Sequence, residues 1–187
     1  MTKVVLCILL SAGLSGCPAV VVAGAAGGAV VANDERTTGS LLEDELIELK
    51  TRKQVSEKLG GRANISVTSY NRRVLLTGQA PSEEVRQEAI DIVRVIHNVR
   101  GIINQIEIAN PSSLTSRASD AALTAKVKFE LCNIQHDNFS CLDVKIVTEL
   151  GVVYLLGLVD RETASIAIQT VRKVPGVIRV VRNFEYR

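Results

Sequence analysis

The sequence has few of the side chains on which catalysis and metal binding depend. Among its 187 residues are two histidines, four cysteines, one methionine and no tryptophan, and aromatic residues make up 3%. Twenty-two Lys and Arg against 20 Asp and Glu leave a net charge of +2, far from the sustained basic surface of a dedicated nucleic-acid-binding protein. No apolar run reaches the roughly 18 residues of a membrane span. We therefore expect no enzyme and no nucleic-acid partner, and we predict no cofactor and no metal site.

The first seventeen residues have the pattern of a secretory signal. A basic start at Lys3 is followed by an apolar run over residues 4–10 and then by small residues. The signal ends in Leu-Ser-Gly-Cys17, which resembles the bacterial lipobox, the motif at which lipoproteins are acylated and cleaved. The resemblance implies a signal peptide over residues 1–16 and a lipidated Cys17 as the first mature residue. Because Pro18 follows instead of the Asp that commonly signals inner-membrane retention, the resemblance also implies the outer membrane.

An uncharged stretch of Gly, Ala and Val follows over residues 18–32. It is too short for an ordinary helical span, and its glycines disfavour a stable helix in water. We interpret residues 17–45 as an acylated N-terminus and a tether near the lipid surface. The alternative is a small-residue segment that enters the bilayer or self-associates.

One apolar pattern occurs twice in the rest of the chain. Val74-Leu-Leu-Thr-Gly78 matches Val153-Tyr-Leu-Leu-Gly157, and apolar residues from Val99 to Ile106 match those from Val177 to Phe184. Such an ordered series indicates an internal duplication. In each copy, helical and alternating periodicities predict the order helix, strand, strand, helix, strand. This order predicts an α+β fold, with a three-stranded mixed sheet packed on two helices in each copy.

The boundaries follow from the same periodicities and from helix start and stop signals. Helices are predicted at about 46–59, from Ser82, at 121–134, and at 161–174 after an N-cap at Asp160. Strands are predicted at about 63–70, 73–79, 101–108, 142–149, 152–158 and 178–186. The two copies span 46–108 and 121–187, with a linker over 109–120.

The duplicated unit resembles the BON domain, as found in dual-BON periplasmic lipoproteins of Gram-negative bacteria. Its signature is a turn glycine, Val-x-Leu-x-Gly and Gly-Val-x-x-Val, which the second copy carries at Gly151, 153–157 and 176–180. In the first copy Arg72 stands opposite Gly151, and Asn98 stands opposite Gly176. Because Asn tolerates left-handed backbone, we expect Asn98 to keep its turn and Asn71 to replace the other glycine.

The sheet of the second copy has two apolar faces. One alternating set should face the helices, and it comprises Val144, Ile146, Val153, Leu155 and Phe184. The other set is too apolar for a solvated face, and it includes Val147, Tyr154, Leu156 and Val181. We expect the second face to pack against the first copy. The alternative is an open site for a protein partner or lipid.

Cys132, His136 and Cys141 form the one cluster with ligand-like spacing. Three interpretations remain open: a Cys132–Cys141 disulfide, free buried thiols, or a metal site that would lack the usual fourth ligand of structural zinc. An oxidising periplasm favours the disulfide.

The best candidate for membrane contact is the first helix of the second copy. Lys126, Lys128 and Phe129 combine cationic groups with an apolar ring, which suits anionic headgroups and shallow insertion. The alternative is an ordinary amphipathic helix with solvated lysines. A rival basic surface lies near the end of the second copy and comprises Arg172, Lys173, Arg179 and Arg182.

These observations lead to one functional hypothesis and two rivals. The resemblance implies an outer-membrane-anchored lipoprotein that faces the periplasm, binds anionic phospholipid through its BON domains and supports envelope integrity. One rival is a periplasmic adaptor that binds an envelope protein partner. The other is a membrane-perturbing lipoprotein, since some similar proteins are labelled haemolysins.

Overall fold

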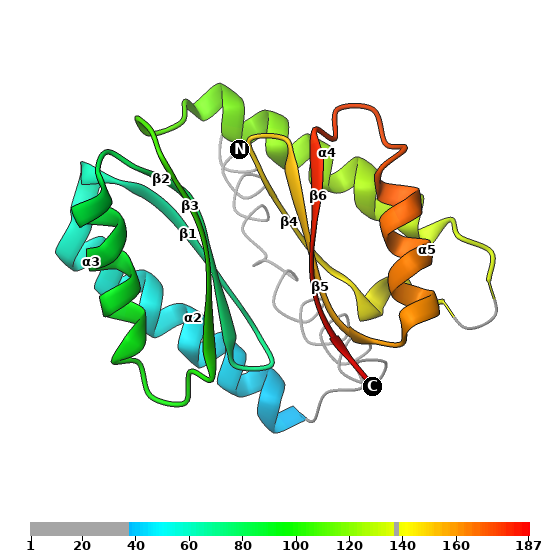
Figure 1. The fold of residues 1–187 in the computed structure, drawn as a ribbon, viewed down its shortest axis with the longest axis horizontal. Helices are drawn as coiled ribbons and strands as arrows, with labels where there is room; N and C mark the ends of the chain where they lie inside the picture. Colours follow the sequence, from blue (N-terminus) through cyan, green and yellow to red (C-terminus); the bar gives the residue numbers. More distant parts are fainter. Residues whose placement is uncertain (1–37, 137–138) are drawn as a thin grey trace, which may run out of the picture. The chain divides into compact units, whose positions relative to one another are not determined.

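The computed structural model describes residues 38–136 and 139–187, which form two modules of the same design (Figure 1). The predicted signal peptide, Cys17 and the stretch over residues 18–32 lie outside the described residues. Module 1 contains α2 (Thr38–Leu59), η2 (Gly60–Arg62), β1 (Asn64–Tyr70), β2 (Arg73–Ala80), α3 (Glu83–Arg94) and β3 (Gly101–Ile108). Module 2 contains α4 (Leu114–Cys132), η3 (Cys141–Asp143), β4 (Lys145–Glu149), β5 (Val152–Val159), α5 (Arg161–Val171) and β6 (Arg179–Tyr186).

Each module has a three-stranded mixed sheet with two helices on one face (Figure 1). In module 1, β2 is central, antiparallel to β1 and parallel to β3. In module 2, β5 is central, antiparallel to β4 and parallel to β6. Buried apolar side chains from the helices and the covered sheet face form one core in each module. The predicted α+β class and the arrangement within each copy are confirmed.

Two helices begin earlier than their apolar periodicity predicts. α2 begins at Thr38 instead of about residue 46, and α4 begins at Leu114, so that α4 includes the second half of the predicted linker. Ser113 caps α4 by accepting a hydrogen bond from the Ser116 N–H at 3.1 Å. The added turns carry mostly exposed side chains, so they lack the apolar repeat by which amphipathic helices are recognised. The predicted caps of the other helices, Ser82 and Asp160, are confirmed.

The tight turns tolerate the departures from the BON signature. In module 2, Leu150 and Gly151 have φ of 49° and 72°, and in module 1 Asn71 and Arg72 have φ of 49° and 61°. Positive φ at both central residues is typical of the type I′ hairpin. Arg72 therefore adopts left-handed backbone itself, in addition to Asn71. Asn98 keeps its turn as predicted, with φ of 69°.

A buried aspartate on the first helix of each module holds the hairpin turn. The Asp44 carboxylate accepts hydrogen bonds from the N–H groups of Asn71 and Arg72, both at 2.7 Å. The Asp120 carboxylate accepts from the N–H groups of Leu150 and Gly151, both at 2.9 Å. These charge-assisted bonds fix the helix against the sheet and offset the strain of left-handed residues.

The second face of each sheet is covered at a contact between the two modules, which belong to one compact unit. The side chains buried in this contact are Tyr70, Leu75, Val152, Tyr154 and Leu156. Tyr154 is only 2% exposed. The expected packing of this face against the first copy is confirmed, and the alternative of an open partner site on the sheet is wrong.

Polar groups complete the contact between the modules. Gln79 Nε2 donates to Glu149 Oε1 at 2.7 Å, and Lys145 Nζ donates to Glu48 Oε1 at 2.8 Å. The Tyr70 hydroxyl accepts from the Leu158 N–H at 3.0 Å. The last residue of β5 that pairs with β4 is Leu156. The N–H of Leu158 lies beyond the end of this pairing, so the Tyr70 hydroxyl supplies the acceptor that β4 does not.

Candidate functional site

The outward face of α4 presents the residues predicted to contact lipid. The opposite face buries Leu123, Val127 and Leu131 in the core of module 2. With 3.6 residues per turn, Phe129 lies opposite these core residues, and Lys126 and Lys128 flank it on either side. Phe129 is 65% exposed, and both lysines are exposed. The structure therefore places an apolar ring between two solvated ammonium groups on one helix.

A surface hollow of about 390 Å³ adjoins this face of α4. Lys126 lines the hollow together with the Leu150–Gly151 turn and the loop from Pro175 to Ile178. Ile178 is 78% exposed. It adds an apolar residue that the sequence interpretation missed, because its position within Gly-Val-x-x-Val was attributed to the strand that follows.

The corresponding helix of module 1, α2, has no aromatic residue at the position of Phe129. Aligning the paired aspartates Asp44 and Asp120 places Lys50 opposite Lys126 and Lys53 opposite Phe129. Both lysines of module 1 are exposed. Module 1 therefore has cationic groups on its first helix but no aromatic ring between them.

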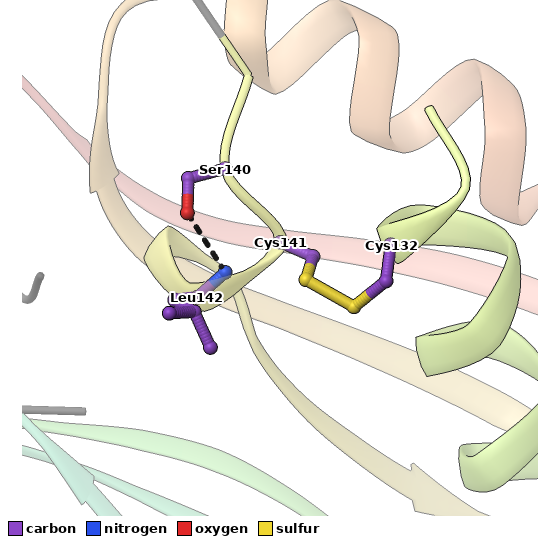
Figure 2. Close-up of a disulfide and its surroundings, with 4 residues drawn as sticks. All are labelled: Cys132, Ser140, Cys141 and Leu142. Carbon is purple, nitrogen blue, oxygen red and sulfur yellow. Dashed lines mark hydrogen bonds between the residues drawn. A yellow bond between two sulfur atoms is a disulfide. The ribbon is translucent and has the colours of Figure 1, made fainter. Parts of the chain in front are cut away.

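A disulfide joins Cys132 at the end of α4 to Cys141 at the start of η3, with a Cα–Cα distance of 5.0 Å (Figure 2). Next to it, Ser140 Oγ accepts from the Leu142 N–H at 3.3 Å and caps η3 (Figure 2). The third residue of the predicted cluster, His136, lies 3.6 Å from Glu162 instead, measured from Nε2 to Oε1. In the structure the two sulfur atoms are thus bonded to each other and hold the loop that leads into β4.

The strand that follows this loop begins later than predicted. The alternation of apolar residues predicts a strand from about residue 142, but Cys141–Asp143 form a 3-10 turn and β4 begins at Lys145. Cys141 is bonded to Cys132 at the end of α4, and a 3-10 turn also precedes the first strand of module 1, at Gly60–Arg62.

The described part of the chain shows two further features that bear on function. None of its helices is both long and apolar enough to cross a membrane. Within the same residues, no group of three or more His, Cys, Asp and Glu side chains is placed to hold a metal ion.

Burial changes the pKa of one carboxyl group near the module contact. Glu149 is 9% exposed, and this burial raises its pKa above the ordinary value, while the hydrogen bond from Gln79 opposes the change. Asp120 and Glu107 raise the pKa further by charge repulsion. This group serves the packing of the two modules and lies outside the α4 face.

The comparison with protein families decides the classification. The BON domain model matches residues 43–110 and 119–187, so it covers both modules. The chain belongs to the BON domain family. Module 1 is hereafter BON domain 1, and module 2 is BON domain 2.

Three relatives are similar to this chain over most of its length. The outer membrane lipoprotein DolP of Haemophilus influenzae is 34% identical over 97% of this chain and 95% of its own length. The 21 kDa hemolysin of Actinobacillus pleuropneumoniae is 29% identical over 82% of this chain and 79% of its own. The osmotically-inducible protein Y of Escherichia coli is 25% identical over 78% of this chain and 73% of its own.

Proposed function

We propose that this protein is an outer-membrane lipoprotein that faces the periplasm and supports envelope integrity. Acyl chains on Cys17 would anchor it, and the α4 face of BON domain 2 would bind anionic phospholipid. The anchor and location are supported by the lipobox-like sequence and by the similarity to an outer membrane lipoprotein over 97% of the chain. The lipid contact is supported by the α4 face alone.

The observation that carries the lipid contact is the exposed ring of Phe129 between Lys126 and Lys128. A bilayer interface accommodates an apolar ring beside cationic groups, with the ring at the acyl boundary and the charges at the headgroups. Each lysine near an anionic surface contributes about 1 kcal/mol, and burial of the ring adds about 2 kcal/mol. The sum of about 4 kcal/mol corresponds to a roughly millimolar affinity. The α4 face would therefore select the lipid, while the acyl chains hold the protein on the membrane.

The absence of tryptophan from the sequence makes a direct test possible. Phe129→Trp, in a chain that carries Cys17→Ser and cannot be acylated, introduces a single tryptophan at the centre of the site. Vesicles of phosphatidylglycerol should shift its emission to shorter wavelength, and vesicles of phosphatidylcholine should leave it unchanged. Adding Lys126→Glu and Lys128→Glu should abolish the shift.

The matched control uses the equivalent helix of BON domain 1. Lys50→Glu with Lys53→Glu makes the same change in net charge on α2 and should preserve the emission shift. If both pairs of substitutions reduce the emission shift equally, vesicle binding depends only on the net charge of the protein. The proposal that α4 binds the lipid is then wrong. If the introduced tryptophan shows no shift with either lipid, the helix does not enter the interface.

A second candidate function is membrane perturbation, which the similarity to the 21 kDa hemolysin favours. It predicts that the acylated protein releases a dye trapped in phosphatidylglycerol vesicles. Vesicles that stay intact at high protein concentration would exclude it. The remaining rival, a periplasmic adaptor for an envelope protein, must use a surface other than the sheet face, because Tyr154 is buried between the domains.

A further inference from the structure

A second basic site lies on BON domain 2, between α5 and the edge strand β6. A surface hollow of about 300 Å³ brings together three arginines, Arg161 and Arg172 from the two ends of α5 and Arg182 from β6. Ser165, Gln169 and Tyr186 line the same hollow and offer hydrogen-bond donors. Of the basic residues noted in the sequence near this end of the chain, Arg172 and Arg182 meet here, whereas Lys173 and Arg179 do not line the hollow.

Local structure brings these residues to one place. Arg161, Ser165 and Arg172 follow one another at helical spacings of four and seven residues, so they form a stripe along one side of α5. On β6, Arg182 and Tyr186 lie on the same sheet face as Phe184, which is buried under the helices. Because β6 is an edge strand beside α5 (Figure 1), its residues on that face form the other wall of the hollow.

The three guanidinium groups have no countercharge within the part of the chain that the structure describes. No carboxylate among these residues forms an ion pair with Arg161, Arg172 or Arg182. The acidic residues that neighbour the site in sequence are engaged elsewhere: Asp160 with Thr163 and Arg187, Glu162 with His136, and Glu185 with Asn71. A bound anion would supply the countercharge that the described residues do not.

Arg161 lies at the start of α5 and is held there by an aromatic ring. It is the first residue of α5, where the helix dipole disfavours a positive side chain. Its guanidinium stacks on the Tyr186 ring, with 4.9 Å from Cζ to the ring centroid. Stacking of this kind holds the planar group in place and leaves its N–H donors available at the edges.

From this geometry we propose that the hollow between α5 and β6 binds a phosphate-bearing anion. Guanidinium groups match the oxygen geometry of phosphate through paired hydrogen bonds. A phosphate group also presents several acceptor oxygens, so it can accept from more than one arginine at a time. The site is separate from the α4 face, because α4 packs on β4 and α5 packs on β6, at opposite edges of the sheet. It therefore does not depend on the lipid contact proposed for α4.

The test titrates the Cys17→Ser chain with inorganic phosphate at constant ionic strength and follows backbone amide resonances by NMR. We expect saturable changes at Ser165, Gln169 and Tyr186. Arg172→Gln with Arg182→Gln should weaken binding about tenfold or more, because two charge-assisted contacts are lost. Lys173→Gln with Arg179→Gln is the matched control, since it removes the same charge from exposed positions outside the hollow, and it should leave binding unchanged.

Further measurements distinguish a lipid headgroup from a soluble phosphate compound, and they can contradict the proposal. If Arg172→Gln with Arg182→Gln also weakens binding to phosphatidylglycerol vesicles, the ligand is a lipid headgroup. If it weakens only the binding of free phosphate, the ligand is a soluble phosphate compound. Absence of saturable changes, equal loss in the control variant, or equally tight binding of acetate would each show the proposal to be wrong. Substitutions at Lys126 and Lys128 should leave the phosphate titration unchanged, which separates this site from the α4 site.

Discussion

At the scale of single residues, a duplicated aspartate holds the hairpin turn of each BON domain. Asp44 and Asp120 are 4% and 8% exposed, and each accepts hydrogen bonds from two consecutive backbone N–H groups of a hairpin turn. With the turn held in this way, BON domain 1 retains its backbone with Arg72 where BON domain 2 has Gly151. The sequence contained a signal for this role, since an aspartate recurs at the same place in both first helices.

Asp120→Ala should destabilise the protein by about 3 kcal/mol, because two half-buried N–H groups lose a charged acceptor. Asp120→Asn keeps one acceptor oxygen and should cost about half as much. Urea unfolding followed by circular dichroism measures both values. Equal stability of Asp120→Ala and the wild type would show that the turn needs no acceptor from the helix.

Glu149 makes stability depend on pH in a defined direction. Burial raises its pKa in the folded protein, so between the ordinary and the raised pKa the folded state holds a proton that the unfolded state has released. The free energy of unfolding therefore falls as pH rises through this range. Glu149→Gln removes the titration and keeps an acceptor for Gln79, so it should be more stable than the wild type at neutral pH. Below the ordinary pKa the two proteins should unfold alike. A stability difference that is the same at every pH would contradict this account.

At the scale of helices and strands, the periodicity of apolar residues correctly predicted the elements that have one face in a core. The strands expected at 63–70 and 101–108 occur as Asn64–Tyr70 and Gly101–Ile108, because alternating apolar residues must face a core. The early turns of α2 and α4 could not be predicted, since their side chains are mostly exposed and carry no such pattern. The start of β4 was also missed, because the 3-10 turn at Cys141–Asp143 occupies residues whose apolar alternation resembles a strand.

The Cys132–Cys141 bridge closes a short loop, with a sequence separation of nine residues. Loop closure of this size restricts the unfolded chain and stabilises the folded protein by roughly 2–3 kcal/mol in the chain-entropy account. Cys132→Ser with Cys141→Ser should therefore lower the urea midpoint, and a reducing agent should do the same to the wild type. The reducing agent should have no effect on the double variant. A wild-type midpoint that is indifferent to reduction would show that the bridge contributes nothing to stability.

At the scale of the whole molecule, the two BON domains are joined through the sheet faces that each would otherwise expose. The apolar pattern of the second copy predicted this contact, since Tyr154 and Leu156 had no other place to be buried. Its polar members, such as Gln79 and Glu149, had no signal in the sequence, because each is a single residue whose partner lies in the other domain. The contact also buries the second face of each sheet, so the proposed lipid contact is placed on a helix.

The most direct measurement of the proposed function is co-sedimentation of the Cys17→Ser chain with vesicles. Phosphatidylglycerol and phosphatidylcholine vesicles are compared at low and at physiological salt. If BON domain 2 selects lipid through Lys126, Lys128 and Phe129, the protein sediments with phosphatidylglycerol only, and salt weakens the binding by screening. If the protein stays in the supernatant with both lipids at low salt, the acyl anchor is its sole membrane contact, and the proposed lipid-binding role of the BON pair is wrong.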